Sequence, residues 1–332
     1  MGGTNMKLKR VILASFLAAL MLFSAGITAA VVLPETSIVA EAATSKKPGK
    51  PALSSVSNAK TGIKITWKKA SNTSGYYIYR KTGSGKWKRV GKANAKTTSF
   101  VDKTAKNGKT YRYTVRAYWG SVKSSYNTTG LKIRRTTVKT VLKAYKTYLK
   151  KYNRSHDGDP RFLLGYIDSD ALPELLIAEG SFHISRVMIY TYYNGKVCKL
   201  IGKTWGHDGK LFKETAFGET GAVNYAPKKN LIFSFHLQTG IQSATFYKIK
   251  NGSLQRVKAF YDDLGFQWDS GDTTYKINNK KVSKKTYNKQ YNSLKNKYSL
   301  VTAYYGDGSF ITDSNLNDMV KHPAWFLAEK NQ

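Results

Sequence analysis

The sequence predicts a multidomain protein in which an all-β sandwich is followed by an α+β domain with a mostly antiparallel sheet and flanking helices. Two observations lead to this fold class. Residues 51–136 contain short runs in which apolar and polar residues alternate between turn sequences, a pattern typical of antiparallel strands. Residues 137–332 begin with a helical apolar stripe and continue with strand-like runs and two more helix-like segments.

Residues 1–43 are interpreted as a signal peptide. Lys7, Lys9 and Arg10 precede the apolar stretch 11–33 and a small-residue site at Ala40-Glu41-Ala42, which is the order of features in a secretory signal. The apolar stretch is also long enough to span a bilayer, so a retained anchor is the alternative. We therefore expect a secreted, extracellular protein associated with the cell wall, with a linker at 44–50.

Charge separates the two expected domains. Residues 46–136 contain 23 Lys and Arg but one acidic residue, Asp102, whereas residues 137–332 contain 29 basic and 17 acidic residues. A module of such charge attracts polyanions. Because an exported chain rarely meets nucleic acid, we expect anionic cell-wall polymers, such as wall teichoic acid, or acidic glycans as partners. The alternative is a lysine-rich surface that serves solubility alone.

The expected strands of the first domain follow one another at short intervals. The alternating runs occupy residues 63–67, 76–80, 87–90, 99–101 and 111–117, and turn sequences occupy 72–75, 83–85 and 107–108. Strands of this length and spacing are typical of an antiparallel β-sandwich.

These runs also carry a family resemblance over residues 51–134. I-K-I-T-W at 63–67, G-Y-Y-I-Y-R-K at 75–81, S-F-V-D at 99–102 and N-G-K-T-Y-R-Y-T-V-R-A-Y at 107–118 resemble a fibronectin type III domain of the kind found in secreted Gram-positive proteins. The resemblance implies that Trp67 is buried in the second strand. It also implies that the Tyr111 hydroxyl ties the preceding corner of the chain.

In that family the module is a spacer or a weak binding unit, so the resemblance implies no activity. We expect eight basic side chains on the solvent side of the strands to form the polyanion surface: Lys64, Lys68, Arg80, Lys86, Lys88, Arg89, Arg112 and Arg116. The alternative for each is the outward half of an alternating strand, without a ligand.

The second domain, residues 137–332, is expected to begin with an amphipathic helix at 138–151. Buried strands are expected at 162–167 and 174–178, and further strands at 187–193, 196–201, 231–237, 244–249, 253–257 and 274–277. Asn194-Gly195 between two of these runs is a strong hairpin sequence. Helices are expected at 284–297, capped by Ser283, and at 314–321.

The turn between the two buried strands is acidic. Asp168-Ser-Asp170-Ala-Leu-Pro-Glu174-Leu resembles the D-x-D-G-x-P-E-L turn of uncharacterised secreted Firmicutes domains and, more distantly, Asp-rich calcium loops. The resemblance implies Asp168, Asp170 and Glu174 as possible calcium ligands. Tyr166 at the first ligand position and Ala171 in place of Gly depart from the calcium loops, so a plain acidic turn is the alternative.

The sequence contains no H-E-x-x-H, G-x-S-x-G or phosphate-loop motif. The lone cysteine, Cys198, excludes an intramolecular disulfide. We therefore expect a non-enzymatic binding or adhesion protein without a cofactor. The alternative is a secreted carbohydrate- or cell-wall-active hydrolase, with the C-terminal domain catalytic and the sandwich as an accessory.

Overall fold

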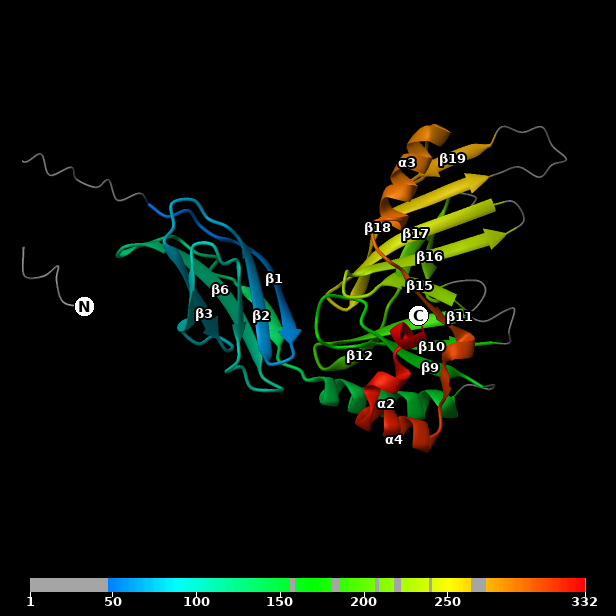
Figure 1. The fold of residues 1–332 in the computed structure, drawn as a ribbon, viewed down its shortest axis with the longest axis horizontal. Coiled ribbons are helices and arrows are strands. Elements are labelled where there is room, and N and C mark those ends of the chain that lie inside the picture. Colours follow the sequence, from blue (N-terminus) through cyan, green and yellow to red (C-terminus); the bar gives the residue numbers. More distant parts are fainter. Residues whose placement is uncertain are drawn as a thin grey trace, which may run out of the picture. The chain divides into compact units, whose positions relative to one another are not determined.

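The structure is a computed structural model that describes residues 47–155, 159–180, 186–206, 209–217, 222–238, 241–263 and 273–331. The chain separates into two compact units, Met1–Thr44 and Ser45–Gln332, and every described residue lies in the second unit. The expected signal peptide therefore lies outside the described residues. Within them the structure is mostly antiparallel β-sheet with three α-helices (Figure 1).

The N-terminal part of the described chain consists of two antiparallel sheets. The strands of the first sheet, in spatial order, are β1 (Ala52–Ala59), β2 (Gly62–Lys68) and β5 (Ser99–Asp102). The second sheet contains β4 (Lys88–Asn94), β3 (Gly75–Lys81), β6 (Thr110–Trp119) and β7 (Val122–Lys123), and β8 (Leu131–Arg134) also pairs with β6. Each of the five alternating runs predicted from the sequence overlaps one of the strands β2 to β6.

The two sheets share one hydrophobic core, because successive side chains of a strand point to opposite faces. The buried core residues stand at alternate positions: Ile63, Ile65, Trp67, Tyr76, Ile78, Tyr111, Tyr113, Val115 and Ala117. All members of this core lie between Leu53 and Ile133. Two sheets around such a core are compatible with a β-sandwich. The boundary predicted at residues 136 and 137 stays a prediction.

Two positions on which the family resemblance depended have the expected environments. Trp67 is buried, and its ring packs edge-on against Tyr76 at 5.2 Å between ring centroids. The buried Tyr111 side chain accepts a hydrogen bond at its hydroxyl from the backbone N–H of Lys106, 3.0 Å away. This bond fixes the turn that precedes β6.

The C-terminal part of the described chain begins with a helix and a five-stranded antiparallel sheet. The sheet contains, in spatial order, β12 (Lys196–Lys199), β11 (Arg186–Tyr193), β10 (Glu174–Glu179), β9 (Arg161–Gly165) and β22 (Ser309–Phe310). Helices α2 (Val138–Arg154) and α4 (Asp313–Lys321) cover one face of this sheet (Figure 1). The Thr137 hydroxyl caps α2 by accepting a hydrogen bond from the N–H of Thr140.

Strands β9 and β10 are buried on both faces, as their apolar runs predicted. Leu175 and Ile177 face the core under α2 and α4, whereas Leu176 and Ala178 face a second core on the other side of the sheet. The Asn194-Gly195 turn joins β11 to β12, and both residues have positive φ, 50° and 88°. A two-residue turn that needs positive φ at both positions favours Asn-Gly, so the hairpin prediction is confirmed.

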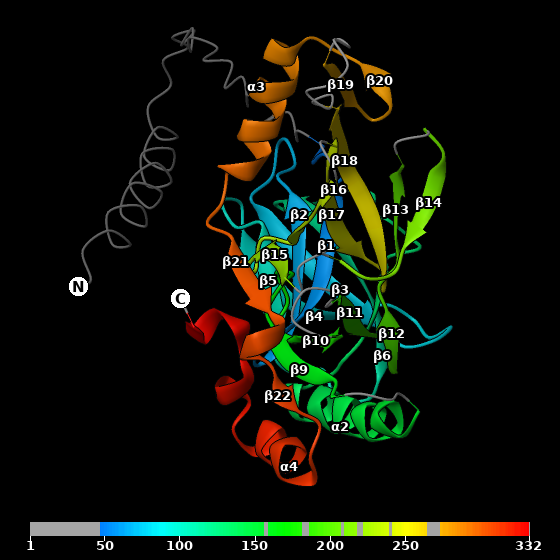
Figure 2. The ribbon, with the colours of Figure 1, turned by 90° about the vertical axis from the view of Figure 1, so that its right-hand side faces the viewer.

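A seven-stranded antiparallel sheet follows. Its strands, in spatial order, are β20 (Lys280–Lys281), β19 (Thr274–Ile277), β18 (Ser253–Asp263), β17 (Ile241–Lys250), β16 (Leu231–Gln238), β15 (Ala222–Ala226) and β21 (Val301–Tyr304). Helix α3 (Lys284–Lys295) packs Tyr287 into the core on one face. The hairpin of β13 (Gly202–Trp205) and β14 (Leu211–Glu214) lies beside β18 (Figure 2).

Several short elements were not predicted. They are β1, β7, β8, β13, β14, β15, β20, β21 and β22, and the 3₁₀ turns η1 (Tyr305–Asp307), η2 (Pro323–Phe326) and η3 (Ala328–Asn331). Many of these elements are four residues or shorter, which leaves too few positions for a period to appear. Among the described residues, no helix combines the length and the apolar character needed to cross a bilayer.

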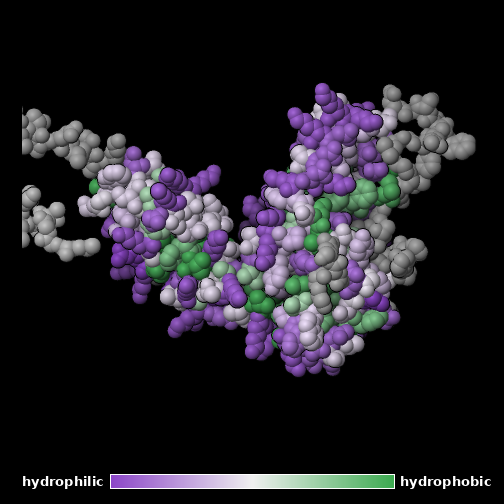
Figure 3. Space-filling model, in the orientation of Figure 1, coloured by the Kyte–Doolittle hydropathy of each residue, from purple (hydrophilic) through white to green (hydrophobic). Residues whose placement is uncertain are grey.

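The exposed side of α3 is basic. Figure 3 shows hydrophilic side chains gathered over this helix. The exposed lysines on it are Lys284, Lys285, Lys289 and Lys295.

Candidate anion-binding face

Residues 46–136, called the N-terminal module from here on, contain a single acidic residue, and its side chain is buried. Asp102 is 1% exposed and lies 2.7 Å from the Arg80 guanidinium. It also accepts hydrogen bonds from the Tyr113 hydroxyl at 2.7 Å and from the backbone N–H of Thr104 at 2.9 Å. Burial alone would raise the pKa of Asp102, but these hydrogen bonds and the charge of Arg80 outweigh burial and lower it.

Arg80 therefore differs from the other predicted anion-binding residues. On β3 it shares the core-facing side with Tyr76 and Ile78, because residues two apart along a strand share a face. The expectation that it lies on the solvent side is corrected by its pairing with Asp102. Its charge is neutralised within the module.

The remaining seven predicted residues are spread over both sheets. Lys64 and Lys68 are exposed on the outer face of β2, in the first sheet. Lys86 and Lys88 are exposed in the β3–β4 connection and at the start of β4. The structure thus does not gather all eight residues into one surface.

Arg89, Arg112 and Arg116 lie on the second sheet, on the face away from the core. Arg112 donates from Nη1 to the carbonyls of Thr129 at 3.1 Å and Gly130 at 3.3 Å. Arg89 and Arg116 instead lie beside aromatic rings on this outer face.

The outer face of the second sheet contains a stacked pair of tyrosines. Tyr77 of β3 and Tyr118 of β6 have ring centroids 4.4 Å apart and an angle of 20° between the rings. Basic side chains from β4, β6 and β7 surround the pair. We call these six residues the tyrosine–cation cluster: Tyr77, Tyr118, Arg89, Lys92, Arg116 and Lys123.

Two of these six residues, Arg89 and Arg116, belong to the polyanion surface predicted from the sequence. The period of two already placed Tyr77 opposite to the buried Tyr76 and Ile78. The strand pairing could not be obtained from that pattern. Only the register, in which Tyr77 lies opposite Arg116 on one side and Lys92 on the other, brings the cluster together.

The acidic turn after β9 folds inward instead of pointing into solvent. Asp168 and Asp170 are half-buried, and each accepts a hydrogen bond from backbone two residues ahead. The distances are 2.8 Å from the N–H of Asp170 to Asp168 and 2.6 Å from the N–H of Leu172 to Asp170. This is the side-chain-to-backbone pattern of an Asx turn. Burial raises the pKa of both carboxyls, and the charge of Asp168 adds to the rise at Asp170.

Glu174 is buried at the start of β10 and holds the same turn from the other side. Its Oε2 accepts from the N–H of Ile167 at 3.0 Å, and its Oε1 accepts from the Thr191 hydroxyl at 3.1 Å. Burial and the charges of Asp168 and Asp170 raise the pKa of this carboxyl well above its usual range.

The three acids Asp168, Asp170 and Glu174 are thus brought together, and the hydrogen bonds explain their positions without a ligand. In the part of the chain that the structure describes, no group of three or more His, Cys, Asp or Glu side chains is arranged to hold a metal ion. Calcium binding stays a prediction.

A second buried carboxylate, Glu214 of β14, was not singled out as a site. It is buried between the β13–β14 hairpin and β16 and β17. It accepts hydrogen bonds from the hydroxyls of Ser234 and Tyr247 and lies 2.8 Å from Nε2 of His236. The carboxylate therefore ties the hairpin to the large sheet. One histidine nitrogen contacts both the carboxylate and Ser234, which differs from a catalytic relay, where the two ring nitrogens serve the two partners.

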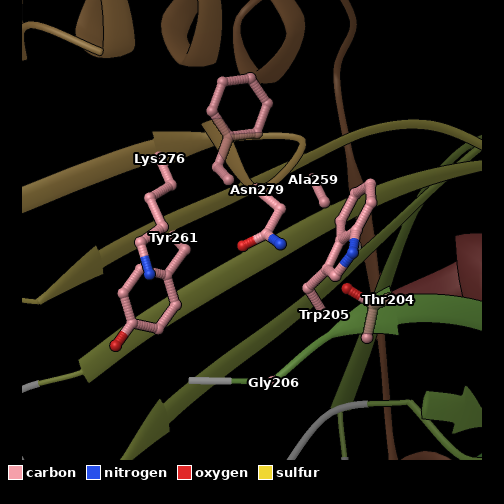
Figure 4. A pocket seen from close by; sticks show the side chains of 8 residues that line it. Thr204, Trp205, Gly206, Ala259, Tyr261, Lys276 and Asn279 are labelled. Carbon is pink, nitrogen blue, oxygen red and sulfur yellow. The ribbon is translucent and has the colours of Figure 1, made fainter. Parts of the chain in front are cut away.

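A small depression lies between β13 and β18 (Figure 4). It has about 10 Å³ of free space, room for one water molecule. Two of the rings that line it lie beside cations: Arg256 Cζ is 3.6 Å from the Trp205 ring centroid, and Lys276 Nζ is 4.9 Å from that of Tyr261. No Asp or Glu lines it. The depression is too small for a sugar ring.

Comparisons with known proteins leave the family of the chain open. No protein-family model matches the sequence, and no curated protein matches it. Among solved structures, one chain described as titin kinase and its flanking domains is similar, with 14% identity and a TM-score of 0.22. The match covers 49% of this chain and 30% of that chain. A likeness at this TM-score supports no argument about function.

Proposed function

We propose that this chain is a secreted, cell-wall-associated binding protein whose N-terminal module, a fibronectin type III domain, attracts anionic polymers by charge. The partners are wall teichoic acid or acidic glycans. The α+β domain that follows is carried as a second module, and the protein needs no catalysis for this role.

One observation carries the proposal. The module contains a single acid, and that acid is buried against Arg80. The remaining basic side chains of the module therefore have no acidic partner within it. Uncompensated cations of this density create a positive potential that concentrates polyanions near the surface.

The resemblance at residues 51–134 supports the fold part of the proposal. The buried Trp67 and the hydrogen bond between the Tyr111 hydroxyl and Lys106 are the two features that the resemblance implied. A family of spacer and weak binding modules fits an anchoring role.

The test is a pull-down of purified protein on Gram-positive cell walls over a salt series. Binding driven by exposed charge weakens steeply between about 50 and 500 mM salt, because the screening length falls from about 14 to 4 Å. Walls stripped of teichoic acid should retain much less protein than intact walls if teichoic acid is the partner. Binding to both stripped and intact walls that does not change with salt concentration would contradict charge-driven attachment.

The outcome of the same experiment separates the two alternatives. A surface that serves only solubility should give no retention on either kind of wall. A wall-active hydrolase should release soluble fragments from the walls during incubation. The depression of Figure 4 gives no support to the hydrolase, since no carboxylate lines it, and the acids at 168, 170 and 174 hold backbone turns.

A further inference from the structure

We infer that the tyrosine–cation cluster is the place where the module binds, and that it takes the phosphate groups of a linear polymer. This inference rests on the proposed function and deepens it. It assigns binding to one face of one sheet, and it names the anionic group. Three features of the cluster lead to it: convergence of charge, positioning by rings, and the directions from which the cations approach.

Three of the four cations lie over the stacked pair: Arg89 and Lys123 over the Tyr77 ring, and Lys92 over the Tyr118 ring. Lys92 of β4 and Arg116 of β6 are the direct cross-strand neighbours of Tyr77. The guanidinium carbon of Arg89 lies 4.9 Å from the Tyr77 ring centroid, and Lys123 Nζ lies 6.0 Å from it. Positive charges that gather around one pair of rings repel one another. Their gathering is therefore costly without a counter-charge, and a bound anion would relieve it.

The rings position the cations without neutralising them. Lys92 Nζ lies 5.1 Å from the Tyr118 ring centroid, so the stacked pair holds cations on both rings. An aromatic face attracts a cation through its quadrupole but has no full negative charge. Arg116 is held by another ring: its guanidinium carbon lies 5.1 Å from the Tyr126 ring centroid, and its Nε donates to the Ser124 carbonyl at 2.8 Å. Its terminal nitrogens have no acceptor among the described residues, so they remain available to an anion.

The approach directions favour phosphate over carboxylate. Arg89 and Lys92 reach the tyrosine pair from β4 and Lys123 reaches it from β7, whereas Arg116 lies next to Tyr77 on β6 and points to Tyr126. A carboxylate has two oxygens in one plane, and a single Arg satisfies both. A tetrahedral phosphate directs its oxygens out of one plane and accepts from donors on two sides. The cluster spans four neighbouring strands, roughly 14 Å at 4.8 Å each, so a polymer with successive phosphates fits it better than a single ion.

The test compares two variants that lose the same charge. The cluster variant carries R89Q, K92Q, R116Q and K123Q. The control variant carries K60Q, K69Q, K103Q and K106Q, four exposed lysines in the connections beside β2 and β5 of the other sheet, outside the eight residues predicted from the sequence. Both variants keep Arg80 and Asp102, and thermal unfolding checks that each one is folded. The ligand is long-chain polyphosphate, titrated against purified full chain in about 100 mM salt.

The cluster variant should lose tenfold or more in affinity, about 1.4 kcal/mol, and the control should lose much less. The slope of log affinity against log salt should fall by about 3 in the cluster variant, at roughly 0.7 for each phosphate contact of a single-stranded polyanion. Equal losses in the two variants would overturn the inference while leaving charge-driven binding intact. A wild-type protein that binds neither polyphosphate nor cell walls would instead overturn the proposed function.

A second pair of variants tests the rings at constant charge. Tyr77→Leu removes the ring under Arg89 and should weaken polyphosphate binding several-fold, whereas Tyr77→Phe keeps the ring and should restore it. Unchanged affinity in Tyr77→Leu would contradict the positioning role of the ring.

Dextran sulfate and polygalacturonate, titrated at matched charge concentration, test whether the cluster prefers phosphate to other anionic groups. Polygalacturonate that binds as tightly as polyphosphate, or dextran sulfate that binds while polyphosphate does not, would overturn the assignment of phosphate.

Discussion

The Arg80 guanidinium lies 2.7 Å from the Asp102 carboxylate, and this ion pair uses the only acidic side chain among residues 46–136. The pair belongs to the core side of the module and not to its surface. It neutralises one cation and leaves the others without an acidic partner in the module. The same contact therefore stabilises the fold and determines the surface charge on which the proposed function depends.

Asp102→Ala should destabilise the protein by about 3–5 kcal/mol, because it leaves a partly buried Arg80 and a buried Tyr113 hydroxyl without their acceptor. Urea unfolding of the full chain measures the loss. Asp313→Asn is the control, since the pair of Asp313 and Lys150 lies on the surface, and it should change stability little. Similar small effects in both variants would show that the buried pair contributes no more than a surface pair.

The lowered pKa of Asp102 also gives a pH dependence. An acid whose folded pKa lies below its unfolded value stabilises the fold above the unfolded pKa, and it loses that contribution as the pH falls through the folded pKa. The stability difference between wild type and Asp102→Ala should therefore be constant above about pH 5 and shrink below about pH 4. Urea midpoints at several pH values measure it. A stability difference that grows on acidification would contradict a lowered pKa of Asp102 in the folded protein.

The contribution of the acidic turn to stability should depend on pH in the opposite direction to that of Asp102. Burial and the charge of Asp168 raise the folded pKa of Asp170, so this group destabilises the fold increasingly as the pH rises from its unfolded pKa through its folded pKa. Asp170→Asn keeps an acceptor for the N–H of Leu172 and removes the charge. Its melting temperature should exceed that of wild type at pH 7, and the difference should vanish near pH 4. Ser169→Ala, in the same turn but exposed, is the control. A lower melting temperature at pH 7 would indicate that the charge is needed, as calcium binding would require.

Tyr247→Phe should weaken the attachment of the β13–β14 hairpin to the large sheet. The Tyr247 hydroxyl is buried and donates to the Glu214 carboxylate. Loss of a hydrogen bond to a charged group costs about 1.5–3 kcal/mol, measured by urea unfolding. Tyr304→Phe is the control, because Tyr304 is 52% exposed, and it should be neutral. Equal stabilities would show that water replaces the lost donor.

Gly202→Ala tests the packing of the β13–β14 hairpin against the large sheet, whereas Tyr247→Phe tests a hydrogen bond between them. A Cβ at Gly202 would lie 2.7 Å from Cζ of the buried Tyr247 ring, whereas a Cβ at Gly306 would have no atom within 4 Å. Overpacking of this kind costs about 1–3 kcal/mol, so Gly202→Ala should lower the urea midpoint and Gly306→Ala should not. A tolerated Gly202→Ala would show that the hairpin can move away from the sheet.

The sequence predicted the elements whose residues repeat with a clear period. Strands β2 to β6, the buried pair β9 and β10, the Asn194-Gly195 hairpin and the three helices all overlap their predicted ranges. Side-chain alternation and turn chemistry are local properties, so they can be seen without knowing what packs against what. The short strands β21 and β22 could not be predicted, because their partners β15 and β9 lie far away along the chain.

The candidate sites also differ in how much of each could be predicted from the sequence. The sequence by itself determined the excess of positive charge in residues 46–136 and the presence of a single acid there. Only the tertiary structure decided that Arg80 turns inward to Asp102 and that Glu174 is buried beside Asp168 and Asp170. It also decided that cations from β4 and β7 lie over Tyr77 and Tyr118, with Arg116 of β6 next to Tyr77. Composition is a sum over residues, whereas the pairing of a charge depends on strand register, which brings together residues that are distant in sequence.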